Sequence, residues 1–378
     1  DLIVDGIIGG VGSVLVFLPN IMLLYLFISL LEDSGYMARA AFIMDRMMHK
    51  IGLHGKSFIP MVMGFGCNVP AVMATRTIES QKSRLITMLI IPLMSCAGRM
   101  PVYILIAGAF FPHHAGVVLL GLYALGIILA IIAAKVMSRF FKDDDLPFVM
   151  ELPPYRVPTG KSVFRHTWEK GRQYLQKMSG IILICSLVIW FLGYFPNHDA
   201  YSSPKEQQEN SFIGYVGKAI EPVLKPLGFD WRMGVGIVAG VGAKELVVST
   251  LGVMYADDQP VNTEAYIPPV IPDAVLSDTS SVTLPPPSVT SSEVEKSVDS
   301  DQVAETRLQK ALVNSVTPAG ALAYMVFILL YFPCIATFVA IKNEAGGWKW
   351  AIITAVYTII LAWVAAFITF RIAMLFGL

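Results

Sequence analysis

Three of the four cysteines lie where an apolar stretch is interrupted by glycine, proline or arginine. A helix that breaks inside a membrane leaves backbone carbonyl and N–H groups without partners. A thiolate beside such a break is a soft anionic ligand that suits borderline or soft divalent metals. The pattern therefore predicts metal-ligating thiols at helix breaks, and the residues concerned are Cys67 with Gly64, Gly66 and Pro70, Cys96 with Gly98 and Pro101, and Cys334 with Pro333.

Four further side chains extend this candidate set. Met63 lies four residues before Cys67, so helical spacing would place both on one face, although a buried methionine is about as commonly a gap-filling core residue. Asn68 and Thr337 stand close to the first and third thiols in the sequence. Glu245 is a carboxylate in apolar surroundings, where it needs a cation as its partner: a metal ion, the neighbouring lysine or an arginine.

Other notable groups have simpler explanations. Arg76 and Arg99 either serve the site or reach the interface and cap a half-helix. Cys185, inside a plain apolar run, is expected to be a small buried hydrophobe. All four cysteines stand in apolar segments rather than loops, which is not the pattern of a disulfide framework.

The elements that position these residues are expected to be membrane helices. Of the 378 residues, 55% are hydrophobic and 15% are charged, which is too apolar for an ordinary soluble domain. Several runs reach the roughly 20 apolar residues needed to cross a bilayer. We therefore expect an all-α, polytopic membrane protein with about seven to eight transmembrane or re-entrant segments. The formal net charge of zero gives no electrostatic argument for a nucleic-acid partner.

Basic residues predict the orientation of these segments. Lys and Arg are in excess from Lys135 to Lys177, which places that loop in the cytoplasm. Counting back from there, the residues around Lys82 and the basic segment Ser34–Lys56 also fall inside. If both flanks of the Cys67 segment are cytoplasmic, the segment must enter and return, and it is predicted to be a re-entrant hairpin.

Two further segments follow in the second half of the chain. Trp231–Tyr255 is a glycine-rich apolar segment with Lys244 and Glu245 embedded in it. The Cys334 segment has the same plan as the Cys67 segment: an apolar helix, a break with a thiol, and a short apolar stretch that ends in a basic residue. Paired interrupted segments point to a transport site near the membrane midplane, so we predict that these two correspond as an internal repeat.

The motifs together resemble a known family. They are Gly66–Arg76, Cys96–Tyr103, Glu151–Tyr155, Gly242–Glu245 and Tyr331–Cys334. In this order and over nearly the whole chain, they resemble the membrane domain of the bacterial ferrous iron transporter B family (FeoB). The resemblance implies two gate-type inverted repeats, Fe²⁺ as the transported substrate and a multi-pass location in the bacterial inner membrane. It also implies that Cys67, Cys96 and Cys334 line the iron path.

The family pattern includes parts that this sequence does not show. FeoB proteins carry an N-terminal GTP-binding domain, and no phosphate loop is present here. GTP and Mg²⁺ are therefore expected only on that other domain, and this chain is not expected to be an enzyme. The resemblance further implies the lipid bilayer, the GTPase domain, small cytoplasmic Feo accessory proteins and further copies of the chain as partners, with no nucleic acid.

We divide the chain into five parts on this basis. The sequence opens on Asp1 without an initiator methionine, which suggests a piece of a longer protein. The predicted parts are residues 1–142, the first gate-type membrane half with the re-entrant Cys67 segment; 143–178, a cytoplasmic connector with an amphipathic helix; 179–256, membrane helices; 257–308, a polar, acidic, disordered insertion; and 309–378, the second gate-type segment with Cys334 and the final helix.

Two alternative functions remain open at this stage. Gate-type repeats also resemble those of nucleoside carriers, so the chain could be a nucleoside-type or other small-solute permease, indifferent to the loss of its thiols. It could also be a non-transporting signalling or scaffold subunit whose helix breaks serve packing. An intramembrane metalloprotease is disfavoured because no His-Glu-x-x-His pattern occurs.

Overall fold

The computed structural model describes residues 9–141, 157–195, 210–256 and 308–377, and these residues fold into helices without a strand. The expected all-α class is confirmed. Residues 257–307 of the predicted insertion, and 143–156 of the predicted connector, lie outside the described residues. The main helices are α1 (Gly9–Asp33), α2 (Tyr36–Lys50), α3 (Phe58–Gly66), α4 (Asn68–Ala74), α5 (Gln81–Ile90), α6 (Met100–Phe110), α7 (Ala115–Phe140), α8 (Gly160–Tyr194), α10 (Phe212–Leu224), α11 (Trp231–Gly242), α12 (Leu246–Ala256), α14 (Pro318–Leu330), α15 (Ile335–Glu344) and α16 (Trp348–Leu375).

Several of these helices match the dimensions of a membrane. Among the described residues, four are long and apolar enough to cross one: 81–110, 115–140, 318–344 and 348–375. The pair 21–33 and 36–50, bent by 81°, makes a fifth if it is counted as one span. The chain is thus a multi-pass helical membrane protein, while the number of seven to eight segments stays a prediction.

The Cys67 segment forms a hairpin. Helix α3 ends at Gly66, the backbone of Cys67 is extended (φ −151°, ψ 130°), and α4 starts at Asn68 and packs against α3. Pro70 falls in the first turn of α4, where a missing N–H costs no hydrogen bond. Lys56 Nζ and Glu79 Oε1, one before and one after the hairpin, are 2.7 Å apart. The segment therefore enters and returns at one end of the molecule, which is the geometry predicted for it.

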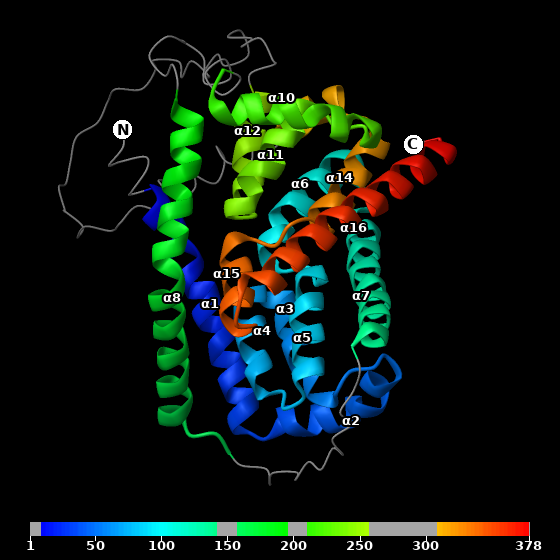
Figure 1. Ribbon diagram of the computed structural model, residues 1–378. Helices are drawn as coiled ribbons and strands as arrows, with labels where there is room; N and C mark the ends of the chain where they lie inside the picture. Colours follow the sequence, from blue (N-terminus) through cyan, green and yellow to red (C-terminus); the bar gives the residue numbers. More distant parts are fainter. Residues whose placement is uncertain (1–8, 142–156, 196–209, 257–307, 378) are drawn as a thin grey trace, which may run out of the picture.

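A second hairpin enters from the opposite end, with α11 and α12 near the top of Figure 1 and α3 and α4 in the lower half. The Tyr255 hydroxyl, at the end of α12, donates to the Asp230 carboxylate, just before α11, at 2.8 and 2.9 Å. The two arms touch, because a Cβ atom on Gly240 would lie 2.5 Å from Val247 Cγ2. The tip of this hairpin is the short turn at residues 243–245.

Each hairpin is followed by a span that is broken near its middle. In the span 81–110 the backbone is extended at Met94 (φ −72°, ψ 132°) and at Cys96 (φ −80°, ψ 161°) between α5 and α6. In the span 318–344 it is extended at Tyr331 (φ −64°, ψ 178°) and Cys334 (φ −56°, ψ 151°) between α14 and α15. Both breaks are next to prolines, which cannot donate to a helix ladder.

These elements correct the predicted pairing of repeats. The sequence pairs Cys67 with Cys334, but the first lies at a hairpin tip and the second in a broken span. By position in the fold, Cys67 corresponds to the tip at Lys244 and Glu245, and Cys96 corresponds to Cys334. The sequence pattern missed this because it compared the residues around each break, whereas the fold depends on the end from which each segment enters.

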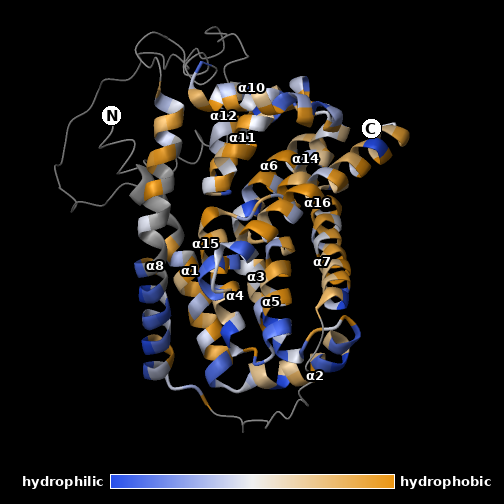
Figure 2. Cartoon of the chain, viewed as in Figure 1, coloured by the Kyte–Doolittle hydropathy of each residue, from blue (hydrophilic) through white to orange (hydrophobic). Residues whose placement is uncertain are grey.

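The remaining helices surround this centre. α8 runs unbroken from Gly160 to Tyr194, so the predicted boundary between residues 178 and 179 falls inside one helix; Gly180 alone does not break it. Figure 2 shows the lower half of α8 as hydrophilic and α7 as largely hydrophobic. The polar half of α8 packs along α1, where Lys170 pairs with Glu32.

Candidate functional site

The two hairpin tips and the two span breaks converge. Glu245, at the tip of the second hairpin, reaches the first broken span, because a Cβ atom on Gly98 would lie 2.8 Å from Glu245 Oε1. Its neighbour Lys244 reaches the second broken span and donates from Nζ to the Phe332 carbonyl at 2.7 Å. The first hairpin packs on α15 and on the short turn Ile91–Leu93. Four interruptions from distant parts of the chain therefore share one region.

The three predicted thiols lie in this region. Cys67, Cys96 and Cys334 are unpaired and half-buried. Cys67 and Cys334 pack against the same buried cluster, and the break that holds Cys96 meets the second hairpin tip at Glu245. The three thiols do not form a closed cage: across the described residues, no three His, Cys, Asp or Glu side chains lie close enough to hold one metal ion. In the part of the chain that the structure describes, the three thiols are therefore spread along the breaks, unlike the clustered ligands of a four-coordinate structural site.

Oxygen atoms accompany the thiols. Cys334 Sγ is 3.1 Å from the hydroxyl of Thr337, which is fully buried in the first turn of α15. Asn68, beside Cys67, is 4% exposed, and its Oδ1 has no hydrogen-bond partner. Buried acceptors without a donor are uncommon in folded proteins. The Asn68 oxygen is therefore available to a cation at the first hairpin tip.

Two buried basic side chains satisfy backbone carbonyls that the breaks leave without helix partners. Arg99 is fully buried and donates to the carbonyls of Met94 (2.9 Å) and Pro92 (3.1 Å). Lys244 holds the Phe332 carbonyl, as described above. Three carbonyls released by the breaks are thus satisfied by side chains of the protein itself, because buried carbonyls need donors.

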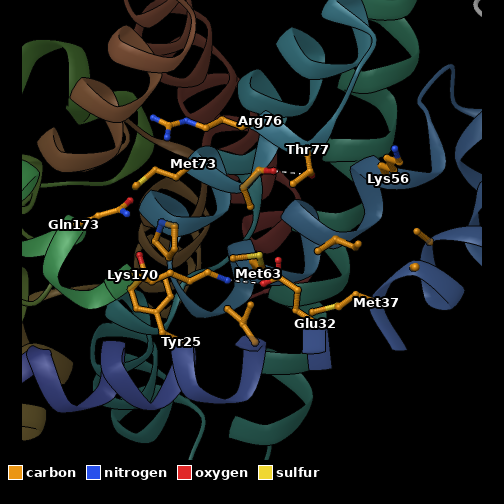
Figure 3. A pocket seen from close by; sticks show the side chains of 16 residues that line it. Tyr25, Glu32, Met37, Lys56, Met63, Met73, Arg76, Thr77, Lys170 and Gln173 are labelled. Atoms are coloured by element: carbon orange, nitrogen blue, oxygen red, sulfur yellow. Dashed lines mark hydrogen bonds and ion pairs between the residues drawn. The ribbon is translucent and has the colours of Figure 1, made fainter. Parts of the chain in front are cut away.

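Met63 faces another feature of the site. A cavity of about 440 Å³ lies beside the first hairpin, and Met63, Pro70 and Met73 from both arms form part of its wall. Figure 3 shows Met63 and Tyr25 among the side chains that line it, with the Glu32–Lys170 ion pair between them. Tyr25 and Met63 belong to one buried cluster, and Cys67 packs against that cluster. The cavity therefore approaches the back of the hairpin tip.

Ion pairs hold the other end of the hairpins. Glu344, at the end of α15, has a side chain only 5% exposed and pairs with Arg76 and Arg84. Arg76 Nε donates to Glu344 Oε2 at 2.6 Å. The exposed Glu79 accepts from Lys56, and this hydrogen bond lowers the pKa of its carboxyl. The first hairpin is thereby tied to the second broken span.

The sequence singled out most of these residues but missed three roles. Lys244 and Arg99 were noted only as ionisable groups in apolar runs, and that same signal marks them as buried cations. Tyr331 had no signal beyond its place in the motif Tyr331–Cys334; in the structure its ring lies under Lys244, with Nζ 3.2 Å from the ring centroid. Of the predicted ligands, Glu245 is the one that joins two breaks directly.

Two hairpins that enter from opposite ends, each followed by a broken span, define a helical membrane protein of the inverted-repeat kind found among transporters. The family model Gate, described as nucleoside recognition, matches residues 14–110 and 175–348, which is more than half of the chain. A model described as ferrous iron transport protein B C terminus matches residues 119–170. The chain belongs to the Gate family, and the predicted resemblance to the membrane domain of FeoB proteins is confirmed.

Curated relatives cover the whole chain. A protein of Porphyromonas gingivalis, named Fe(2+) transport protein A/Fe(2+) transporter FeoB fusion protein, is 51% identical over 100% of the chain and 44% of its own length. Fe(2+) transporter FeoB of Staphylococcus aureus is 42% identical over 100% of the chain and 49% of its own length. The FeoB protein of Methanocaldococcus jannaschii is 40% identical over 97% and 49%. The chain thus spans about half the length of these relatives, and no solved structure matches it.

Proposed function

We propose that this chain forms the ion path of a ferrous iron transporter. The observation that carries the proposal is the convergence of Cys67, Cys96 and Cys334 from three separate breaks in an apolar helical protein. Relatives of 40 to 51% identity are named Fe(2+) transporters. An open set of thiols fits conduction, because a permeating ion must bind and then leave.

Each predicted residue has a role in this proposal. The three thiols are successive soft ligands, while Asn68 Oδ1, Thr337 and Glu245 supply oxygen at the hairpin tips and breaks. Met63 lines the approach from the cavity. The glycines and prolines Gly64, Gly66, Pro70, Gly98, Pro101 and Pro333 keep the backbone open at the breaks or next to them and allow the hairpins to move. Selectivity between Fe²⁺ and other divalent metals comes from geometry and gating, since Zn²⁺ and Cu²⁺ bind such ligands at least as tightly.

The remaining parts of the proposal concern the whole protein. A GTP-binding domain outside this sequence gates the path, and GTP and Mg²⁺ act only there. The protein sits in the bacterial inner membrane, with the end that carries Lys56 and α2 in the cytoplasm. The fusion named in Porphyromonas gingivalis supports a small Feo accessory protein as a partner, and we also propose that several copies assemble.

Uptake of ⁵⁵Fe²⁺ into proteoliposomes under anaerobic conditions tests the ligand assignment. With the full-length protein that carries this chain, Cys67→Ser and Cys334→Ser are expected to lower uptake at least about tenfold, because serine is a far poorer ligand for ferrous iron. Cys185→Ser is the matched control and is expected to match the wild type. Size-exclusion profiles verify that each variant is folded. Unchanged uptake in both Cys67 and Cys334 variants would refute the assignment.

The description of the family model keeps one alternative in view. Gate is described as nucleoside recognition, so the same vesicles are offered radiolabelled nucleosides. If the vesicles take up nucleoside and the loss of the thiols does not affect that uptake, the substrate is an organic solute rather than iron. No flux of either substrate would favour the scaffold alternative.

A further inference from the structure

We propose that the Lys244 ammonium is a tethered cation that occupies an ion subsite of the path and must leave before a divalent ion can bind there. This inference rests on the proposed function and assigns a specificity-determining role to a residue at the second hairpin tip. It is carried by the contacts of Lys244 and by the balance of charge around it.

The contacts of Lys244 are those of a cation site. Its side chain is 4% exposed, and its Nζ donates to the Phe332 carbonyl at 2.7 Å. That carbonyl belongs to the break of the second span, so without Lys244 it would face the path as a free oxygen ligand. The face of the Tyr331 ring lies 3.2 Å from the ammonium, and aromatic faces attract cations. Cys334 follows Phe332 by two residues in the same break.

The charge balance explains why this subsite cannot hold two cations. Arg99 is fully buried, and its guanidinium donates to the backbone carbonyls of Met94 and Pro92 rather than to a carboxylate. Glu245 is the carboxylate nearest in sequence. With Lys244 and Arg99 as cations, Glu245 as a carboxylate and the thiols protonated, the region carries one net positive charge. A divalent ion added to this region meets strong repulsion in low dielectric, and withdrawal of the lysine relieves it.

The position of Lys244 allows that withdrawal. It stands in the non-helical turn between Gly242 and Leu246, and its flexible four-carbon stem can turn the ammonium away without moving a helix. In the fold, this tip corresponds to the tip that carries Cys67 in the first hairpin. The two tips thus differ in chemistry: one presents a ligand, and the other presents a competitor for the ligands of the second span.

Anaerobic Fe²⁺ binding to the purified full-length protein tests the competition. Lys244→Met keeps the length of the side chain and removes the charge. If the ammonium fills the subsite nine-tenths of the time, its removal tightens the apparent Kd about tenfold. Lys244→Arg retains a cation and is expected not to tighten binding. The exposed Lys225→Met, in the turn after α10, is a control for charge removal far from the site and is expected to leave the Kd unchanged.

A second variant covers the case in which Lys244→Met does not fold. Tyr331→Leu removes the aromatic face and leaves the lysine, so it loosens the hold on the ammonium and is expected to tighten Fe²⁺ binding by a smaller factor. A folded Lys244→Met with an unchanged or weaker Kd overturns the inference, as does an unchanged Kd in Tyr331→Leu if Lys244→Met is unfolded. If neither the wild type nor any of these variants binds Fe²⁺, the proposed function fails as well, and the two failures are thereby distinguished.

Discussion

At the scale of single residues, Asn68 shows how the site departs from ordinary packing. Its buried Oδ1 has no hydrogen-bond partner, and an unsatisfied buried acceptor costs about 1–3 kcal/mol. A fold retains such a cost where function needs the group, as strained or unsatisfied active sites show. In this chain the oxygen stands next to Cys67, at the tip that approaches the other breaks.

Replacing this amide therefore separates stability from transport. Asn68→Leu, which has the same number of side-chain heavy atoms in the same branched shape and no orphan oxygen, is expected to raise the free energy of unfolding by about 1 kcal/mol or to leave it unchanged, and to lower Fe²⁺ uptake severalfold. Thermal unfolding in detergent and proteoliposome uptake measure the two effects. A variant that unfolds at a lower temperature and transports normally would show that Asn68 is structural.

The sequence located the helix breaks at the three cysteines but not the contacts around them. Cys67, Cys96 and Cys334 were identifiable because glycine and proline beside them mark helix breaks locally. The side chains that donate to the freed carbonyls were not identifiable, because Lys244 and its acceptor Phe332 are 88 residues apart in the chain. Which freed carbonyl a buried cation satisfies depends on how distant segments meet, and periodicity in one segment contains no such information.

At the scale of elements, the Glu344 ion pairs join the first hairpin to the second broken span. Arg76 follows α4, Arg84 lies in α5, and both bind one carboxylate whose side chain is 5% exposed. A hydrogen bond to a charged group contributes about 1.5–3 kcal/mol. The pairs are therefore expected to stabilise the packing of the first hairpin and α5 against the end of α15. The exposed pair of Lys56 and Glu79 marks proximity and contributes little by itself.

A matched pair of substitutions tests this contrast. Glu344→Gln keeps the shape of the side chain and removes its charge, so we expect a loss of about 2 kcal/mol, seen as a lower thermal midpoint. Glu79→Gln, in the exposed pair, is expected to leave the midpoint unchanged. Equal midpoints for wild type and Glu344→Gln would mean that the two arginines do not secure this end of the hairpin.

The two hairpins differ in whether the sequence predicts them. The first was predicted because basic residues on both flanks placed both ends on one side. The second was not predicted. Trp231–Tyr255 has the length of one membrane span, and its apolar residues are interrupted near the middle by Lys244 and Glu245. The hydrogen bond between Tyr255 and Asp230, which closes that hairpin, is a tertiary contact that no local pattern contains.

At the scale of the whole molecule, the fold predicts opposite sides for the two hairpin bases. Gln81 follows the first hairpin at the basic end, and Lys225 precedes the second at the other end; both side chains are exposed. A membrane-impermeant maleimide is expected to label Lys225→Cys from outside intact cells and Gln81→Cys only after lysis. Labelling of both positions from one side would exclude the inverted arrangement.

The central claim is that the thiols from separate breaks bind the transported metal. X-ray absorption at the iron edge, recorded on the full-length protein loaded anaerobically with Fe²⁺, measures the ligands directly. We predict sulfur atoms in the first coordination shell of the wild type, fewer in Cys67→Ser and in Cys334→Ser, and fewest in the triple variant that also carries Cys96→Ser. A wild-type spectrum that contains only oxygen and nitrogen ligands would contradict the account.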